Sequence, residues 1–156
     1  MTPARSRPII ILYAEDDEDD RLLTRDALRA SRLANVLYVV EDGEEAMDYL
    51  FRRGKYVDPA ASPRPDLIIL DLNMPKKDGP EALKEIKATP GVRHIPVVIL
   101  TTSKTEEDIF RSYDLGASSF IAKPVTFQSM VEIVQTLGRY WFEIVELPNS
   151  QGDQAS

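Results

Sequence analysis

Five short apolar runs, spaced along the chain and rich in β-branched residues, most constrain what this chain can fold into. They cover residues 9–14, 36–40, 67–70, 97–100 and 119–122. Several of them lack the strict alternation of a half-buried strand, so we expect strands that are buried on both faces of a sheet. Helical spacing of apolar residues marks the intervening segments, at about 18–31, 43–52, 79–88, 105–115 and 126–145. This alternation predicts an α/β fold in which helices cover both sides of a parallel sheet.

Glycine and proline residues divide the chain at matching places. Asp42-Gly43 and Asp78-Gly79 follow the second and third runs, and Gly116 lies where a helix would end. The prolines between residues 52 and 65 indicate an extended loop before the third strand. With 156 residues the chain has room for one domain, which we expect over residues 8–147, with flexible termini at 1–7 and 148–156.

Charge and composition exclude several classes of function. The formal net charge is −7, and no basic face is visible, which argues against nucleic acid and anionic membranes as partners. There is no Cys and only one His, His94, so thiolate or multi-histidine metal sites are excluded. The apolar run at residues 9–14 is too short for a signal peptide or a membrane span. We therefore expect a cytoplasmic protein, with His94 in a surface loop.

Polar side chains with a shared chemistry follow four of the predicted strands. In an open α/β sheet, ligands bind outside the carboxyl ends of the strands, so these side chains are expected to converge. Clustered carboxylates suit Mg²⁺, and one of them can act as a nucleophile on phosphorus. A Lys and a Thr nearby can contact phosphoryl oxygens. The residues are Glu15-Asp16-Asp17 after the first strand, Asp71 after the third, Thr101-Thr102 after the fourth and Lys123-Pro124 after the fifth.

The same motifs carry a family resemblance that covers about residues 8–140. They read Ile-Leu-Tyr-Ala-Glu15-Asp-Asp, then Asp66-Leu-Ile-Ile-Leu-Asp71-Leu-Asn-Met-Pro, then Pro96-Val-Val-Ile-Leu-Thr101, then Phe120-Ile-Ala-Lys-Pro. In this order and spacing they closely resemble the receiver domain of two-component response regulators. The resemblance implies a flavodoxin-like (βα)5 doubly wound parallel sheet with strand order 2-1-3-4-5, extended by a C-terminal helix. It also implies a phosphoprotein of signal transduction, not an enzyme, which receives a phosphoryl group from a histidine kinase.

The resemblance assigns a role to each matching residue. Asp71 would be the phosphoacceptor, and Mg²⁺, the implied cofactor, would be held by Glu15, Asp16, Asp71 and the backbone carbonyl of Asn73. Thr101 would move toward the phosphoryl group, Lys123 would pair with it, and Phe120 would be the aromatic switch. The bond between Lys123 and Pro124 would be cis.

A narrower resemblance points to one subgroup. The chain is similar to the small stand-alone regulators associated with bacterial and cyanobacterial phytochrome kinases in three segments. These are the long loop before the third strand, the sequence of residues 73–79 and the sequence of residues 140–148. The implied phosphodonor is a light-sensing histidine kinase.

Some residues keep a second interpretation. Asp17 either joins the metal site or only caps the following helix, while Glu18, Asp19 and Asp20 are expected to be a solvated helix start. Thr101 can be a strand-end residue that caps the next helix, and Phe120 can belong to the core.

Two rival functions also stay open. One is a Mg²⁺-dependent phosphohydrolase that forms an aspartyl-phosphate. Such enzymes usually carry a second Asp two positions after the nucleophile, where this chain has Asn73. The other is a receiver-like binding module that is never phosphorylated.

The last predicted helix has two apolar rows, although one row is enough to pack a helix on a sheet. Either both rows lie in one broad buried face, or the second row packs against another subunit. We expect a homodimer through this region, because exposed aromatic patches mark interfaces. The rows are Met130, Val134, Leu137, Trp141 and Ile144, and Ile133, Tyr140 and Leu147, with the aromatic run at Tyr140-Trp141-Phe142.

Overall fold

The computed structural model describes residues 8–30, 35–72, 74–101, 119–122, 128, 131 and 132, and at 35, 101 and 119–122 it describes the backbone alone. Its internal contacts divide the chain into two units, residues 1–8, 22–35 and 124–156, and residues 9–21 and 36–123. The second unit contains nearly all of the sheet and helices α2 and α3. The first unit contains the later part of helix α1 (Glu18–Ala30), which begins in the second unit.

A five-stranded sheet forms the framework of the second unit, in the order β2-β1-β3-β4-β5. The pairs β1/β3, β3/β4 and β4/β5 are parallel. This order confirms the strand order that the resemblance implied. The strands are β1 (Ile9–Ala14), β2 (Asn35–Val40), β3 (Leu67–Asp71), β4 (Val97–Thr101) and β5 (Ser119–Ala122).

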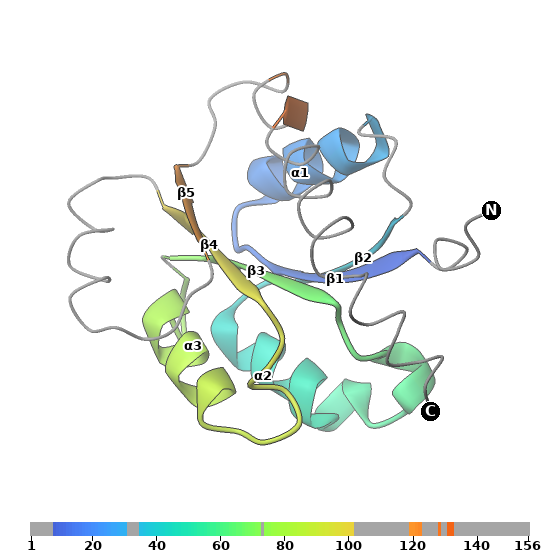
Figure 1. The fold of residues 1–156 in the computed structure, drawn as a ribbon, viewed down its shortest axis with the longest axis vertical. Coiled ribbons are helices and arrows are strands. Elements are labelled where there is room, and N and C mark those ends of the chain that lie inside the picture. The colour runs from blue at the N-terminus through green and yellow to red at the C-terminus, as the bar shows by residue number, and fades with distance from the viewer. Residues whose placement is uncertain are drawn as a thin grey trace, which may run out of the picture. The chain divides into compact units, whose positions relative to one another are not determined.

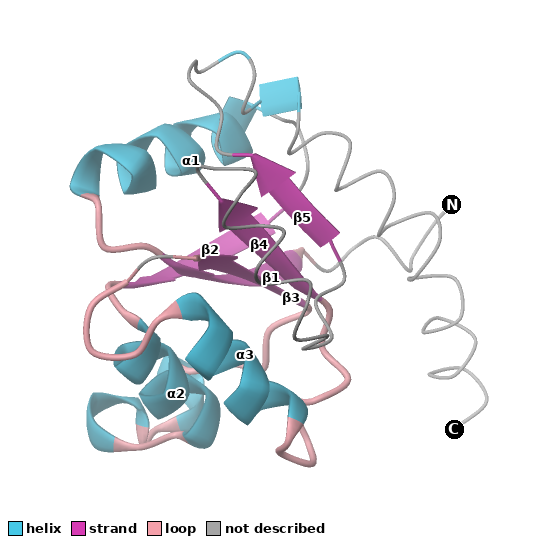
Figure 2. Ribbon diagram, turned by 90° about the vertical axis from the view of Figure 1, so that its left-hand side faces the viewer, coloured by secondary structure: helices cyan, strands magenta, loops and turns pink. Residues whose placement is uncertain are grey.

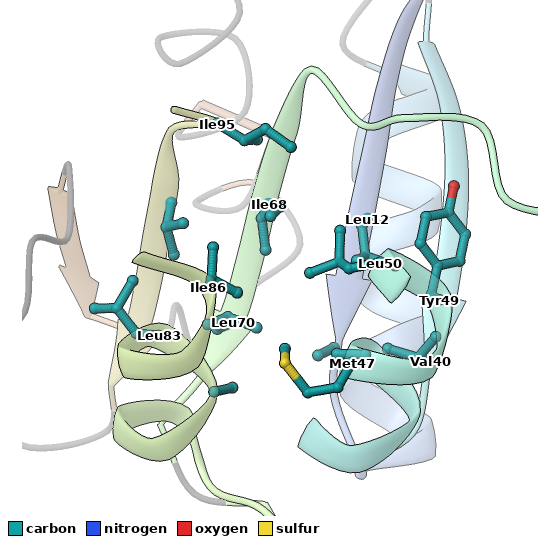
Figure 3. Packing of buried hydrophobic residues seen from close by; sticks show 14 of the residues in the cluster. Leu12, Val40, Met47, Tyr49, Leu50, Ile68, Leu70, Leu83, Ile86 and Ile95 are labelled. Carbon is teal, nitrogen blue, oxygen red and sulfur yellow. The ribbon is translucent and has the colours of Figure 1, made fainter. Parts of the chain in front are cut away.

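Helices α2 (Gly43–Phe51) and α3 (Gly79–Lys87) lie against the same face of the sheet, as Figures 1 and 2 show. Figure 3 shows Met47 and Leu50 of α2, with Leu83 and Ile86 of α3, pointing toward the strands. These side chains pack against every second residue of the strands. Full burial of one Leu or Ile side chain stabilises the fold by about 1.5–3 kcal/mol. The strand members of this cluster are Leu12, Ala14, Val40, Ile68, Leu70, Val97 and Ile99.

Local sequence signals set the ends of both helices. The carboxylate of Asp42 accepts a hydrogen bond from Glu45 N at the start of α2, and Asp78 forms a reciprocal capping box with Glu81 at the start of α3. α2 ends at Phe51, and Arg52 after it takes a left-handed conformation with φ of 55°. Both helices therefore begin at the Asp-Gly pairs that were predicted as turns.

The connection between α2 and β3 differs from the extended loop that the prolines predicted. It contains two short 3₁₀ helices, η2 (Gly54–Tyr56) and η3 (Pro59–Ala61). Asp58 caps η3 by accepting from Ala60 N, and Tyr49 Oη donates to Pro63 O at 2.6 Å. These local bonds satisfy backbone groups that a plain loop would leave to water.

Candidate functional site

The register of β1 against β3 brings the acids of two distant segments together. Ala14, the last residue of β1, is paired with Leu70, so Glu15 and Asp16 follow β1 beside Asp71 at the end of β3. Glu15, Asp16 and Asp71 each offer one carboxylate oxygen, and these oxygens lie within 4.8 Å of one another. The convergence predicted at the carboxyl edge is therefore present for these three acids.

The cluster combines two buried carboxylates with one exposed carboxylate. Glu15 is fully buried and Asp71 is only 4% exposed, whereas Asp16 faces solvent. Carboxylates this close repel one another, and a cation among them removes the repulsion. A set of oxygen ligands with one side open to water suits a hard divalent cation that keeps some of its water molecules. The donor set therefore fits the metal that the sequence predicted.

Glu15 is held through both its side chain and its backbone. Its side chain accepts hydrogen bonds from Tyr13 Oη to Oε1 and from Asp17 N to Oε2, both at 3.2 Å. Its backbone N donates to Val40 O at 3.0 Å, and its carbonyl accepts from Arg21 Nη1 at 2.9 Å. The buried carboxylate is thus oriented by contacts from β1, β2 and the first turn of α1.

Asp17 caps helix α1. One of its carboxylate oxygens accepts from Asp19 N at 2.8 Å and from Asp20 N at 3.2 Å. Glu18, Asp19 and Asp20 form the first turn of α1, where negative charge favours the helix dipole. Of the two interpretations of Asp17, the structure supports the cap.

Gly79 lets helix α3 begin directly against the end of β3. Its backbone N donates to Leu72 O at 3.0 Å, and a Cβ built on Gly79 would lie 2.8 Å from Asp71 O. Any larger residue would therefore have to move the strand end that carries Asp71.

Gly43 has the same role at the start of α2. A Cβ on this residue would overlap the backbone carbonyl of Lys77, in the loop that joins β3 to α3. Beside it, Lys76 Nζ lies 3.8 Å from Asp42 Oδ2, and Lys76 has a left-handed backbone with φ of 67°. The start of α2 therefore supports the loop that follows the predicted phosphoacceptor.

Lys77 is tied to α3 on the other side of this loop. Its Nζ donates to Glu85 Oε1 at 2.7 Å, and this bond raises the pKa of Lys77 above its ordinary value. The bond between Lys77 and Glu85 holds the loop against the helix.

The remaining predicted site residues are described in part or not at all. Asn73, Lys123 and the Lys123-Pro124 bond lie outside the described residues. Thr101 and Phe120 are described by their backbones alone, in β4 and β5, where Thr101 is paired with Ala122. Leu100 is paired with Asp71, so the backbone of Thr101 follows at the same edge of the sheet. Gly116, the predicted helix at 105–115, most of the one at 126–145 and its proposed dimer face also fall outside the described part of the chain.

Several contributors to the site are not predicted from the sequence, among them Tyr13, Gly43 and Gly79. Tyr13 could have been found, because residues two apart in extended chain point to the same side, and Tyr13 precedes Glu15 by two positions. Gly43 and Gly79 were noted only as turn residues. Their close contacts depend on how separate segments pack, which no local pattern reveals.

His94 is exposed in the turn before β4, at the opposite end of that strand from Thr101, as predicted. Within the described residues, no helix combines the length and the apolar character needed to cross a bilayer.

Comparison with known proteins identifies the family. The model of the response regulator receiver domain matches residues 11–135. Response regulator Rcp1 of Synechocystis sp. is 40% identical over 148 residues, which is 95% of this chain and 99% of that protein.

Solved structures agree with this match. The phosphorylated cyanobacterial phytochrome response regulator RcpA is 43% identical with a TM-score of 0.77, over 87% of this chain and 95% of that one. The Mn²⁺-bound form of Rcp1 is 41% identical with a TM-score of 0.75, over 88% and 96% of the two chains. The sheet order, the acids at its carboxyl edge and these matches lead to one conclusion: the chain belongs to the family of response regulator receiver domains.

Proposed function

We propose that this receiver domain accepts a phosphoryl group on Asp71, with Mg²⁺ held beside it by Glu15, Asp16 and Asp71. The observation that carries the proposal is the position of Asp71. It ends a buried central strand, and its carboxylate lies in one cluster with the two acids that follow β1. A nucleophile and its metal ligands are thereby supplied by adjacent strands of one rigid sheet.

The chemistry requires little from the chain beyond this placement. A carboxylate oxygen of Asp71 forms a bond to phosphorus while the bond between phosphorus and the donor's imidazole nitrogen breaks, and the electron pair stays on that nitrogen. The bound cation would neutralise charge on the phosphoryl oxygens. Glu15 and Asp16 would hold the cation next to the nucleophile, and no general base is needed because the attacking carboxylate is already ionised.

We assign the supporting roles by the family motif. The backbone carbonyl of Asn73 adds a metal ligand, Lys123 pairs with the phosphoryl group, and the hydroxyl of Thr101 moves toward it. Phe120 then changes position with the phosphorylation state. The backbone register of Asp71, Thr101 and Phe120 at neighbouring strands supports these assignments.

The proposed phosphodonor is a histidine kinase of the phytochrome type. RcpA is named as a cyanobacterial phytochrome response regulator, and it matches most of this chain. The output is then contact with another protein, in the cytoplasm. The family match also favours phosphotransfer over the phosphohydrolase alternative, in agreement with Asn73 in place of a second Asp.

We further propose that the chain forms a homodimer through the region of its last predicted helix. The proposal rests on the second apolar row and on the aromatic run at 140–142 in the sequence.

The test is phosphotransfer from a labelled phytochrome-type kinase. Asp71→Asn should abolish labelling, because an amide oxygen is a poor nucleophile toward phosphorus. The matched control is Asp58→Asn, at the exposed cap of η3 in the connection that enters β3 from its other end. Asn caps a helix about as well as Asp, so this control should be labelled like the unchanged protein.

Circular dichroism should give the same folded spectrum for both variants. Labelling that survives Asp71→Asn but is lost with Asp16→Asn would contradict the assignment of the phosphoacceptor.

A further inference from the structure

The hydroxyl of Tyr13 reaches a metal-site carboxylate from inside the protein. Tyr13 is fully buried in β1, and its hydroxyl donates to Glu15 Oε1 at 3.2 Å. The amide of Asp17 donates to the other oxygen, Oε2, at the same distance. Two donors on two different oxygens fix the plane of the carboxylate, which a single donor would leave free to rotate.

The backbone of Glu15 is fixed as well. Val40 O accepts from its amide, and the guanidinium of Arg21 donates to its carbonyl. Burial of the side chain then leaves the carboxylate little room to adjust when a cation arrives. The position of the ligand atom is therefore set by the protein before the metal binds.

We infer that Tyr13 is a positioning residue that orients Glu15 for a small octahedral cation and thereby sets the preference of the site for Mg²⁺ over Ca²⁺. Mg²⁺ demands near-ideal octahedral geometry, whereas Ca²⁺ accepts a flexible shell with longer bonds. A carboxylate that can rotate therefore costs Mg²⁺ more affinity than Ca²⁺. The inference rests on the metal site of the proposed function and adds to it a residue to which the family resemblance assigned no role.

The test compares Tyr13→Phe with the unchanged protein by isothermal titration of Mg²⁺ and of Ca²⁺. We expect the Mg²⁺ affinity to fall about tenfold, the low end of the effect of losing a partner of a metal ligand. The Ca²⁺ affinity should fall less, so the ratio of the two affinities should shift toward Ca²⁺. The matched control is Tyr49→Phe, which also removes a hydroxyl from a buried tyrosine, here one that donates to Pro63 O at 2.6 Å. This control should leave the ratio unchanged.

Arg21→Met is a second variant that removes a hydrogen bond to Glu15. Arg21 is only partly buried, and Met keeps much of its apolar stem while it removes the donor to Glu15 O. The variant is expected to fold, and it should shift the ratio of affinities in the same direction. It keeps the inference testable even if Tyr13→Phe does not fold.

The outcomes separate the inference from the proposed function. Suppose that the unchanged protein binds Mg²⁺ and that Asp16→Asn weakens this binding. If Tyr13→Phe and Arg21→Met then leave the ratio of Mg²⁺ to Ca²⁺ affinity unchanged, the inference is wrong but the proposed metal site stands. An equal loss for both ions in Tyr13→Phe also overturns it, because Tyr13 would then support the metal site without setting its preference between the two ions. If the unchanged protein does not bind Mg²⁺, or Asp16→Asn leaves the binding intact, the proposed metal site fails and the inference fails with it.

Discussion

The partly buried carboxylate of Glu45 has three partners. It accepts from Tyr56 Oη at 2.6 Å and from Glu41 N at 2.8 Å, and Lys55 Nζ lies 3.1 Å away. Burial alone would raise the pKa of Glu45, but these partners outweigh it, and the pKa lies below its ordinary value of 4.5. Burial and the bond to Glu45 raise the pKa of Tyr56 above its ordinary value.

These two shifts have opposite consequences for stability. The lowered pKa of Glu45 stabilises the fold above its ordinary value of 4.5, and this contribution is lost as the pH falls through the lowered pKa. The raised pKa of Tyr56 stabilises the fold below its ordinary value of 10.0, and this contribution is lost as the pH rises toward the raised pKa. The pair therefore stabilises the fold most between these two values.

Tyr56→Phe should remove most of the acid-side effect. The variant should unfold more easily at neutral pH, by about 1.5–3 kcal/mol for a hydrogen bond to a charged group. Its free energy of unfolding should then fall less between about pH 6 and pH 3 than that of the unchanged protein, because Glu45 has lost its strongest donor. Urea unfolding at a series of pH values measures both effects.

Tyr38→Phe is the control for this prediction. It removes the hydroxyl of Tyr38, which belongs to the same aromatic cluster; the rings of Tyr38 and Tyr49 lie 5.8 Å apart. The Tyr38 hydroxyl does not donate to Glu45. Its acid-side slope should match that of the unchanged protein. An unchanged slope in Tyr56→Phe as well would contradict the role given to this bond.

At the scale of elements, helix α2 and the loop after β3 meet without side chains between them. Gly43 presents its Cα to the carbonyl of Lys77, so the two backbones lie in direct contact. Gly43→Ala should lower the free energy of unfolding by about 1–3 kcal/mol, the usual cost of forcing a group into a packed site, or more because backbone cannot give way easily. Urea unfolding would measure the loss.

Glu44→Ala supplies the comparison at the next position of the same helix turn. Glu44 is exposed, so its replacement should change the free energy of unfolding by only a few tenths of a kcal/mol. Equal stability of Gly43→Ala and Glu44→Ala would show that the contact with Lys77 is not tight.

The elements themselves were largely predictable. The apolar runs predicted each strand to within one residue at either end. For β3, which is buried along its whole length, the reason is that full burial requires a continuous apolar sequence, whereas the edge strand β2 carries an exposed Val36. The helices α2 and α3 end one residue earlier than their apolar spacing indicated, and after α2 the reason is the left-handed conformation of Arg52, which spacing does not encode. The 3₁₀ helices η2 and η3 were missed because three-residue turns carry no periodic signal.

The same distinction holds for the site. Glu15, Asp16 and Asp71 could be placed together because parallel strands end at one edge and their motif is specific. The contacts of Gly43 and Gly79 could not be predicted, because they depend on how closely each helix start packs against another backbone segment, which no local pattern encodes. Tyr13 lies between these cases. The sequence predicts which side of the strand it is on, but not the hydrogen bond from its hydroxyl to Glu15 Oε1.

At the scale of the whole molecule, the proposed homodimer is open to direct measurement. Sedimentation velocity at tens of micromolar, with and without a phosphate analogue, should give a dimer. Leu137→Glu and Trp141→Glu fall in the first apolar row and should destabilise the fold, whereas Tyr140→Glu, in the second row, should release folded monomers. A monomer of the unchanged protein under both conditions would contradict the proposal.

The charge of the whole chain also has a location. Six acids follow one another at residues 15–20. The first two belong to the acid cluster, Asp17 caps α1 and the other three form its first turn. Most of the net charge of −7 is therefore concentrated at one strand-to-helix turn, and only part of it is available to a cation.

The pairing of β1 with β3 also determines when the acids meet during folding. Glu15 and Asp71 are separated by the whole of β2 and α2. They come together only after a long loop has closed and the register of Ala14 with Leu70 is made. The repulsion among the carboxylates is therefore absent from any state of the chain in which this pairing has not formed. A cation that binds all three acids would stabilise only the states that contain the pairing.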